Sequence, residues 1–524
     1  FYQYRKGREG KQDFWVVMLL FIMTGIAIII FLNQTPREPR ERDYAYAGSF
    51  YAYSIWIGLG VLSLWEFLRK RMKSAPAAVI VTGICLVAVP VNMVAQNWDD
   101  HNRSGRYATI ANAKNYLNSC APNAILFTYG DNDTFPLWYA QEVEGVRRDI
   151  RIVNLSLLNG GWYIDQINRK AYESDRVPIS LTHDQYHDGV REWTVVQEQI
   201  KSANLKDVMA FVASDNPNTK VRTYSGESLD YIPTRNVYIP VDSAKVIANG
   251  TVRPEDADKI VKQVTIPLKG NMISKSSLMV LDILATNNWE RPVYFGIGMG
   301  PDSYMGFENY FQLEGAAYRV VPIYTKATDY YEYGQIDSDI LYDNLMNKFE
   351  WGNIKDPKVN IDYFHDNNIG VMKYRTTFLR LAEKLQEEGK HEKAIAVLDK
   401  SLEELPLSQI PPDNSLINYI PLYYTLGQTD KANHLLNELA TINYQTLRYI
   451  NSLSPEDAHS GDIPQDERIS LNVLQILINF ASRAGQSDVA KEWANQVESL
   501  YNPTAIHPYQ PELQKEIKDT NRPS

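Results

Sequence analysis

Three long apolar stretches near the N-terminus constrain this chain more than any other feature. They run over Phe14–Leu32, Phe50–Leu68 and Pro76–Ala95, and each has about the length that an α-helix needs to cross a bilayer. Glu66, at the end of the second stretch, is the one formal charge inside them. The pattern predicts a membrane region over residues 1–98 with spans near 14–32, 50–68 and 76–95.

Basic residues flank these stretches unevenly. Four precede the first stretch and four separate the second from the third: Arg5, Lys6, Arg8, Lys11, Arg69, Lys70, Arg71 and Lys73. Lys and Arg mark the cytoplasmic side, and both groups fall on that side if successive helices alternate in direction. We therefore expect everything after about residue 96 to be extracytoplasmic, where nucleotide substrates are not available.

The composition limits the remaining function classes. A mean hydropathy of -0.34 means that most of the 524 residues form ordinary water-soluble structure. A net charge of -10 argues against a nucleic-acid partner. Because the chain starts with Phe1, we interpret it as the C-terminal part of a longer membrane protein; the alternative is a chain that truly starts there.

Residues 99–340 alternate between apolar runs and amphipathic stretches. Strands are predicted at 124–129 and 149–158, each followed by a helix, at 135–144 and 162–173. Strand–helix alternation favours parallel pairing with right-handed crossovers, so we expect an α/β domain with a largely parallel sheet. Residues 178–235 give patchy signals and are interpreted as an insertion. Later strands are expected at 236–240, 264–267 and 292–296, with a helix at 276–287.

Residues 362–524 carry only helical patterns. Gly389, Gly427 and Gly485 each begin the motif G-x-x-[DE]-x-A, a glycine turn followed by an acidic helix start. The three motifs recur at uneven spacings along the chain. This resembles tetratricopeptide repeats. The predicted fold class is thus a multi-domain membrane protein: three transmembrane α-helices, an extracytoplasmic α/β domain and a C-terminal α-helical tetratricopeptide-like repeat domain.

The loop between the first two stretches contains Arg37, Arg40 and Arg42. Three arginines on the outer face oppose the usual charge bias, and guanidinium groups at the headgroup level could clamp a lipid phosphate through paired hydrogen bonds. The alternative is that neighbouring Glu38, Glu41 and Asp43 neutralise them in a solvated loop. The residues alone do not decide between these readings.

A second candidate is Gly130-Asp131-Asn132-Asp133-Thr134, between a predicted strand and a helix. Ligands bind at the carboxyl ends of parallel strands, where Asp131, Asn132 and Asp133 could contact a divalent cation or sugar hydroxyls. The plainer reading is that Asp133 or Thr134 caps a helix starting near Phe135.

Other motifs are weaker. Trp138, Tyr139, Trp162 and Tyr163 could stack on a sugar, but a place in the core is the favoured interpretation. His183 and His187 are spaced like half a zinc site but lack the glutamate of H-E-x-x-H, so no metal site is assigned.

Three runs resemble one family: TPREPRERDYAYAGSFYAYSIWIG, ILFTYGDNDTFPLWYAQEVEGVRRDIRIVNLSLL and LDILATNNWERPVYF. These are bacterial polytopic membrane proteins related to a eukaryotic transmembrane protein O-mannosyltransferase, and tetratricopeptide-like tails are usual among them. The resemblance covers residues 1 to about 330. It implies a GT-C-like glycosyltransferase that moves a mannose-like sugar from a polyprenyl-phosphate carrier to an extracytoplasmic protein acceptor. It also implies the bacterial inner membrane, with the C-terminal domains in the periplasm.

In GT-C enzymes the acidic catalytic residue lies in the first external loop, so the resemblance assigns no catalytic residue here. It implies that the catalytic half precedes Phe1 and that this chain alone is inactive. The alternative function is a non-enzymatic, membrane-anchored adaptor that binds a protein partner through its helical repeats.

Overall fold

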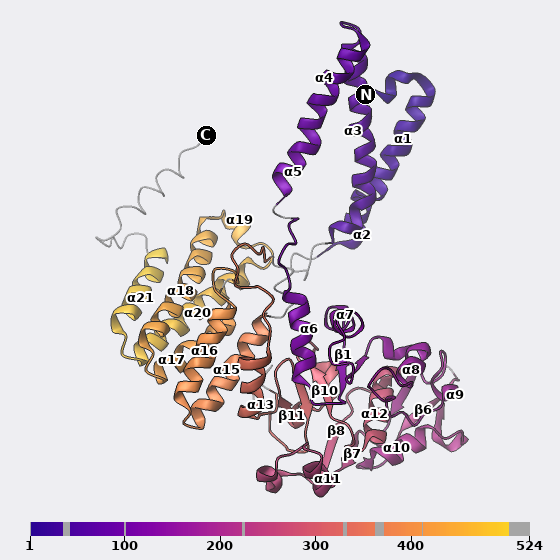
Figure 1. Ribbon diagram of the computed structural model, residues 1–524, viewed down its shortest axis with the longest axis vertical. Helices are drawn as coiled ribbons and strands as arrows, with labels where there is room; N and C mark the ends of the chain where they lie inside the picture. Colours follow the sequence, from indigo (N-terminus) through magenta and orange to yellow (C-terminus); the bar gives the residue numbers. More distant parts are fainter. Residues whose placement is uncertain are drawn as a thin grey trace. The chain divides into compact units, whose positions relative to one another are not determined.

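The computed structural model describes residues 2–34, 42–98, 101–222, 226–327, 333–361, 371–410 and 412–501. The chain divides into two compact units, coloured along the sequence in Figure 1. Phe1–Arg106 and Pro357–Asn368 form the first, and Tyr107–Asp356 and Ile369–Ser524 form the second. The apolar stretches thus belong to the first unit, and the α/β and helical regions share the second.

Three helical segments of the first unit are long and apolar enough to cross a membrane: Gln3–Leu32, Asp43–Leu68 and Ser74–Asn97. Each encloses one predicted stretch, so the expectation of three candidate membrane helices is confirmed. Many of their large apolar side chains are exposed, as expected for helices that face lipid. The helices are α1 (Gly7–Met23), α2 (Ile26–Leu32), α3 (Ala47–Leu68), α4 (Ser74–Leu86) and α5 (Asn92–Asn97).

Helices α1 and α3 pack antiparallel. Lys6 Nζ lies 2.6 Å from Glu66 Oε1, and the Tyr2 hydroxyl donates to the same oxygen at 3.0 Å. At the other end Ser49 Oγ donates to the Phe21 carbonyl at 3.1 Å. The basic residues before α1 and after α3 therefore lie at the same end of the pair. This agrees with the alternating directions assumed from the charge pattern, while the side of the membrane stays a prediction.

The third segment contains Pro90, which changes the local helix geometry. A π-helical turn, Val87–Val91, separates α4 from α5 and includes Pro90. Proline lacks an N–H and its ring crowds the preceding turn of an α-helix. The wider π turn accommodates this without ending the segment.

The centre of the second unit is a six-stranded sheet in the order β13-β11-β12-β10-β1-β2. Strand β1 pairs parallel with β2 and β10, and β11 pairs parallel with β13, but β12 is antiparallel to both β10 and β11. The expectation of a largely parallel sheet is therefore confirmed only in part: the sheet is mixed. The strands are β1 (Ile125–Thr128), β2 (Arg151–Asn154), β10 (Val293–Gly296), β11 (Phe311–Leu313), β12 (Ala317–Val320) and β13 (Gln335–Ile336).

The antiparallel half arises because no helix separates β11 from β12. Only Glu314, Gly315 and Ala316 join them, too few residues for a parallel crossover. Gly315 has φ 129°, and a Cβ there would lie 2.5 Å from Ser119 Oγ, so this tight connection requires glycine.

Aromatic rings fill the core beside this sheet. Phe295 of β10 packs against Phe127 of β1 at 4.9 Å between ring centroids and against Phe311 of β11 at 5.6 Å. Helix α12 (Lys275–Asn287) is buried over most of its length, which explains its nearly continuous apolar sequence. The helix starts one residue before the predicted position.

The segment predicted as an insertion has its own structure. It contributes to a four-stranded sheet, β5-β6-β3-β9, and to a three-stranded sheet, β4-β7-β8. These strands are β3 (Trp193–Val196), β4 (Ala203–Asn204), β5 (Lys220–Arg222), β6 (Ser228–Ile232), β7 (Asn236–Pro240), β8 (Gln263–Pro267) and β9 (Met272–Ser274). The α/β part as a whole contains the helices α6 (Ala108–Ser119), α7 (Asp131–Glu142), α8 (Gly161–Ile167), α9 (His183–Tyr186), α10 (Leu205–Val212), α11 (Ser243–Ala248) and α13 (Ser338–Asp343).

Helical hairpins form the C-terminal part, drawn in orange and yellow in Figure 1. Gly389, Gly427 and Gly485 have φ between 72° and 75° and join successive helices, so the predicted glycine turns are confirmed. The tetratricopeptide assignment itself stays a prediction. The helices are α15 (Val371–Glu387), α16 (His391–Glu404), α17 (Tyr419–Thr425), α18 (Thr429–Ser452), α19 (Pro455–Ala458), α20 (Ile463–Arg483) and α21 (Ser487–Tyr501).

Buried polar contacts tie the helical part to the α/β part. The Tyr374 hydroxyl of α15 donates to Asn112 Oδ1 of α6 at 2.6 Å. Next to it, the fully buried Arg375 forms an ion pair with Asp413 at 2.5 Å and donates to the Ile410 carbonyl at 3.0 Å. The Tyr374 contact and the bond from Arg380 to the Gly334 carbonyl at 3.0 Å join α15 to the α/β part, whereas the Arg375 contacts hold α15 within the helical part.

Candidate functional site

The loop after β1 is held by buried hydroxyl groups. Thr134 Oγ1 donates to the Gly130 carbonyl at 2.8 Å and lies 2.8 Å from Thr128 Oγ1. Asn154, at the end of β2, donates to Thr134 Oγ1 at 2.8 Å. The carboxyl ends of two neighbouring parallel strands are thus joined at the first turn of α7.

Helix α7 begins at Asp131, four residues earlier than predicted. Gly130 occupies the cap position and no side chain caps the helix, so the expected capping role of Asp133 or Thr134 is wrong. Both aspartates instead lie in the first turn, where a negative charge interacts favourably with the helix dipole.

Asp133 turns toward the protein. The Tyr116 hydroxyl lies 3.5 Å from Asp133 Oδ1 and accepts a hydrogen bond from Gly298 N at 3.0 Å. A Cβ on Gly298 would lie 2.3 Å from Asp133 Oδ2, so glycine makes room for the carboxylate. Burial raises the pKa of Asp133, while the charge of Lys373 and the bond from Tyr116 lower it. Such a carboxyl group is suited to proton transfer or to holding a polar ligand.

Asp131 and Asn132 are exposed, in contrast to the partly buried Asp133. Residues two apart on a helix do not face each other, so the two aspartates do not converge on one cation. Among the residues that the structure describes, no group of three or more His, Cys, Asp or Glu could hold a metal ion. Asp131 and Asn132 therefore face solvent, whereas Asp133 faces the protein from the same helix turn.

The other sequence candidates have different outcomes. Arg37 and Arg40 lie outside the described residues, and Arg42 is exposed just before the short helix Asp43–Tyr46. His183 contacts Asp165 at 3.0 Å and lies in α9, whose start carries a capping box. The hydrogen bond from His183 lowers the pKa of Asp165.

The four aromatic candidates, Trp138, Tyr139, Trp162 and Tyr163, differ in burial. Tyr163 is buried and its hydroxyl accepts a hydrogen bond from Asn154 N at 2.9 Å, as the core interpretation requires. Tyr139 and Trp162 are exposed, so that interpretation is wrong for them. Trp138 is partly buried and packs against Phe135 with the two rings tilted and their centroids 5.4 Å apart.

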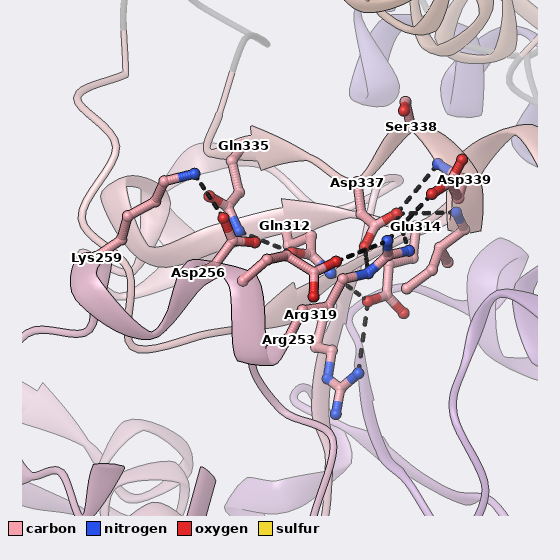
Figure 2. A network of polar contacts seen from close by, with 12 residues as sticks. Arg253, Asp256, Lys259, Gln312, Glu314, Arg319, Gln335, Asp337, Ser338 and Asp339 are labelled. Atoms are coloured by element: carbon pink, nitrogen blue, oxygen red, sulfur yellow. Dashed lines mark hydrogen bonds and ion pairs between the residues drawn. The ribbon is translucent and has the colours of Figure 1, made fainter. Parts of the chain in front are cut away.

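A polar cleft of about 630 Å³ lies between the α/β part and α15, and no sequence motif predicted it. Figure 2 shows the network along one wall, where Arg253 bonds Asp337 at 2.6 Å and Asp339 at 3.1 Å. Asp337 also caps α13 by accepting from two backbone N–H groups. Residues more than eighty positions apart meet here, which no local pattern could predict.

A buried chain of hydrogen bonds leads from this cleft into the sheet. Gln335 donates to Gln312 at 2.8 Å, and Gln312 donates to Glu314 at 2.7 Å (Figure 2). Glu314 in turn accepts from the Tyr294 hydroxyl at 2.5 Å. Burial and the neighbouring Glu314 charge raise the pKa of Tyr294. The cleft could thus bind a ligand rich in hydroxyl or amide groups.

Comparison with known proteins addresses the α/β part. Residues 109–340 match the family model described as TMEM260-associated domain 2. The match contains both the Asp131–Asp133 turn and most of the α/β wall of the cleft. No curated protein and no solved structure matches the chain.

Proposed function

We propose that this chain serves a membrane glycosyltransferase-like protein, which transfers a mannose-like sugar from a polyprenyl-phosphate carrier to an extracytoplasmic protein acceptor. One observation carries the proposal: three helices of membrane-crossing length precede a region that matches TMEM260-associated domain 2. A lipid-linked donor suits a reaction outside the cytoplasm, where nucleotide sugars are absent. The proposed location is the bacterial inner membrane, with the second unit in the periplasm.

Two groups of residues have roles in this scheme. Arg37, Arg40 and Arg42 would hold the carrier phosphate, because guanidinium groups match phosphate oxygens geometrically. Asp131 and Asn132, exposed at the start of α7, would contact the acceptor or its sugar. Asp133 would orient that contact from the partly buried side of the same turn. A divalent cation remains a candidate cofactor without an assigned site.

The test measures sugar transfer from a radiolabelled polyprenyl-phosphate donor in membranes that contain the protein. Arg40→Glu should lower transfer at least tenfold without lowering protein abundance, because it places a negative charge against the phosphate. Arg468→Glu, which reverses an exposed arginine on α20 away from the membrane segments, is the matched control and should leave transfer within twofold. Unchanged transfer in Arg40→Glu, or equal losses in both variants, would refute the phosphate-binding role.

The helical hairpins favour a second candidate, a membrane-anchored adaptor. Stacked hairpins such as α17–α18 and α20–α21 form surfaces that bind peptides and helices in other proteins. Covalent cross-linking of the whole chain in its membrane should then recover a stable protein partner. Recovery of such a partner together with no sugar transfer would favour the adaptor over the transferase.

A further inference from the structure

The polar cleft between the α/β part and α15 has no role in the proposed function. Its volume of about 630 Å³ is that of a small-molecule site. Its lining is almost entirely polar or charged, which favours a polar ligand, and the Asp131–Asp133 turn is not part of it. The cleft is therefore a site apart from the residues assigned to sugar transfer.

Ion pairs hold many of the charged side chains on the cleft wall. Arg253 bonds Asp337 at 2.6 Å, and Lys259 Nζ lies 2.5 Å from Asp256 Oδ1 (Figure 2). Paired charges cancel much of each other's field, while their remaining oxygens and N–H groups stay at fixed positions. A hydroxyl group can both donate and accept a hydrogen bond, so such pairs suit a hydroxyl-rich ligand better than a multiply charged one.

Gln335 adds an amide group to the same wall. It donates one N–H to Gln312 at 2.8 Å, and no other residue of the described chain bonds its side chain. An amide carries two N–H donors and a carbonyl acceptor. Gln335 can therefore donate to one ligand oxygen and accept from a second hydroxyl group.

Arg380 of α15 is the exception to this charge pairing. It lines the cleft and is only 8% exposed, yet no acidic side chain in the described part of the chain pairs with it. Its Nη2 donates to the Gly334 carbonyl at 3.0 Å, while Nη1 is buried without a hydrogen-bond acceptor at bonding distance in that part of the chain. Arginine is rarely buried without an anion beside it, because a buried charge is costly unless it is paired.

The one titratable hydroxyl group beside Arg380 does not supply that anion. Burial raises the pKa of Tyr318 to about 12 even though the Arg380 charge lowers it, so the hydroxyl stays neutral. A ligand in the cleft can provide the missing negative charge.

We propose that the cleft binds an acidic saccharide, whose carboxylate pairs with Arg380 and whose hydroxyl groups bond Gln335 and the ion pairs of the wall. A carboxylate matches the parallel N–H groups of a guanidinium. A phosphate dianion would be repelled more strongly by the seven acidic side chains of the lining. The ligand would contact β13 and α15 at once, and the site holds for the transferase and for the adaptor alike.

The test is isothermal titration calorimetry of the whole chain in phosphatidylcholine nanodiscs. The probes are glucuronate, galacturonate, glucose and acetate at equal ionic strength. The better-bound uronate should bind at least tenfold more tightly than glucose, which lacks the carboxylate, or acetate, which lacks the hydroxyl groups. Its methyl glycoside distinguishes two sources: equal affinity assigns the site to a unit within a glycan, and weaker binding assigns it to a free sugar acid. Uronate binding should also slow hydrogen exchange in β13 and α15.

Substitutions of Arg380 test the carboxylate contact. Arg380→Met should lower the affinity for the uronate to that for glucose. Arg380→Lys keeps the charge but loses the paired N–H geometry, so it should weaken uronate binding several-fold. Arg468→Met, which replaces an exposed arginine on α20, is the matched control and should leave binding within twofold.

The comparison of probes needs only the unaltered chain, so a variant that fails to fold does not obscure the result. The proposal is overturned if both uronates bind no more tightly than glucose, or if neither binds at about 10 mM. Tighter binding of inorganic phosphate than of either uronate would also overturn it, as would unchanged uronate binding in a folded Arg380→Met variant.

Discussion

The hydroxyl cluster under the Asp131–Asp133 turn gives the sharpest prediction. Thr134→Val keeps the shape of a fully buried side chain but removes three hydrogen bonds, to Gly130, Thr128 and Asn154. At about 1 kcal/mol for each bond, the free energy of unfolding should fall by about 2–3 kcal/mol. Thr134→Ser keeps the hydroxyl and loses one methyl group, so it should cost only about 0.8 kcal/mol.

Hydrogen exchange of the peptides that cover α7 measures this locally. Exchange of the first-turn amides by local opening should accelerate about 30-fold in Thr134→Val, since 1.4 kcal/mol corresponds to a factor of ten. Adding Thr128→Val should cost less than the sum of the single changes, because both partners of one bond are then apolar. The reasoning is refuted if Thr134→Val and Thr134→Ser are equally stable.

Three other changes test separate parts of the fold. Burial raises the pKa of Asp133, so the free energy of unfolding should fall as the pH rises from the ordinary Asp range through that raised pKa. Asp133→Asn should remove this fall without making the protein more stable at pH 3, as measured by chemical unfolding at a series of pH values. Gly485→Ala places a side chain at φ 75° in open space and should lower the melting temperature through about 1 kcal/mol of backbone strain, while Ser482→Ala, at an exposed position near the end of α20, should not. Arg253→Met leaves the largely buried Asp337 carboxylate without its ion pair and should destabilise by about 1–3 kcal/mol in chemical unfolding, an effect that the double variant with Asp337→Asn should reduce.

Local patterns predicted the elements well where the chain is strongly apolar. Strand β7 matches its predicted bounds, and β8, β10 and α12 differ by one residue at their starts. The membrane segments and glycine turns followed from length and from single residues with special backbone geometry. Their common feature is that the physical cause lies within a few neighbouring positions.

The failures involve contacts between distant residues. The β11–β12 hairpin consists of three- and four-residue strands, too short for a clear alternation of side chains. The start of α7 was misplaced because Asp131–Asp133 resemble a cap, whereas buried bonds from Thr128 and Asn154 fix the turn. The polar cleft joins Arg253, Asp337 and α15, which only the folded chain brings together.

The central claim is that the second unit lies outside the cytoplasm, since the donor lipid, the acceptor and the phosphate-binding loop all depend on it. Alkaline phosphatase fused after Tyr501 is active only when it is exported, and a green fluorescent protein fused there is bright only in the cytoplasm. The account predicts an active phosphatase and a dark fluorescent protein. A bright fluorescent protein with an inactive phosphatase would contradict it.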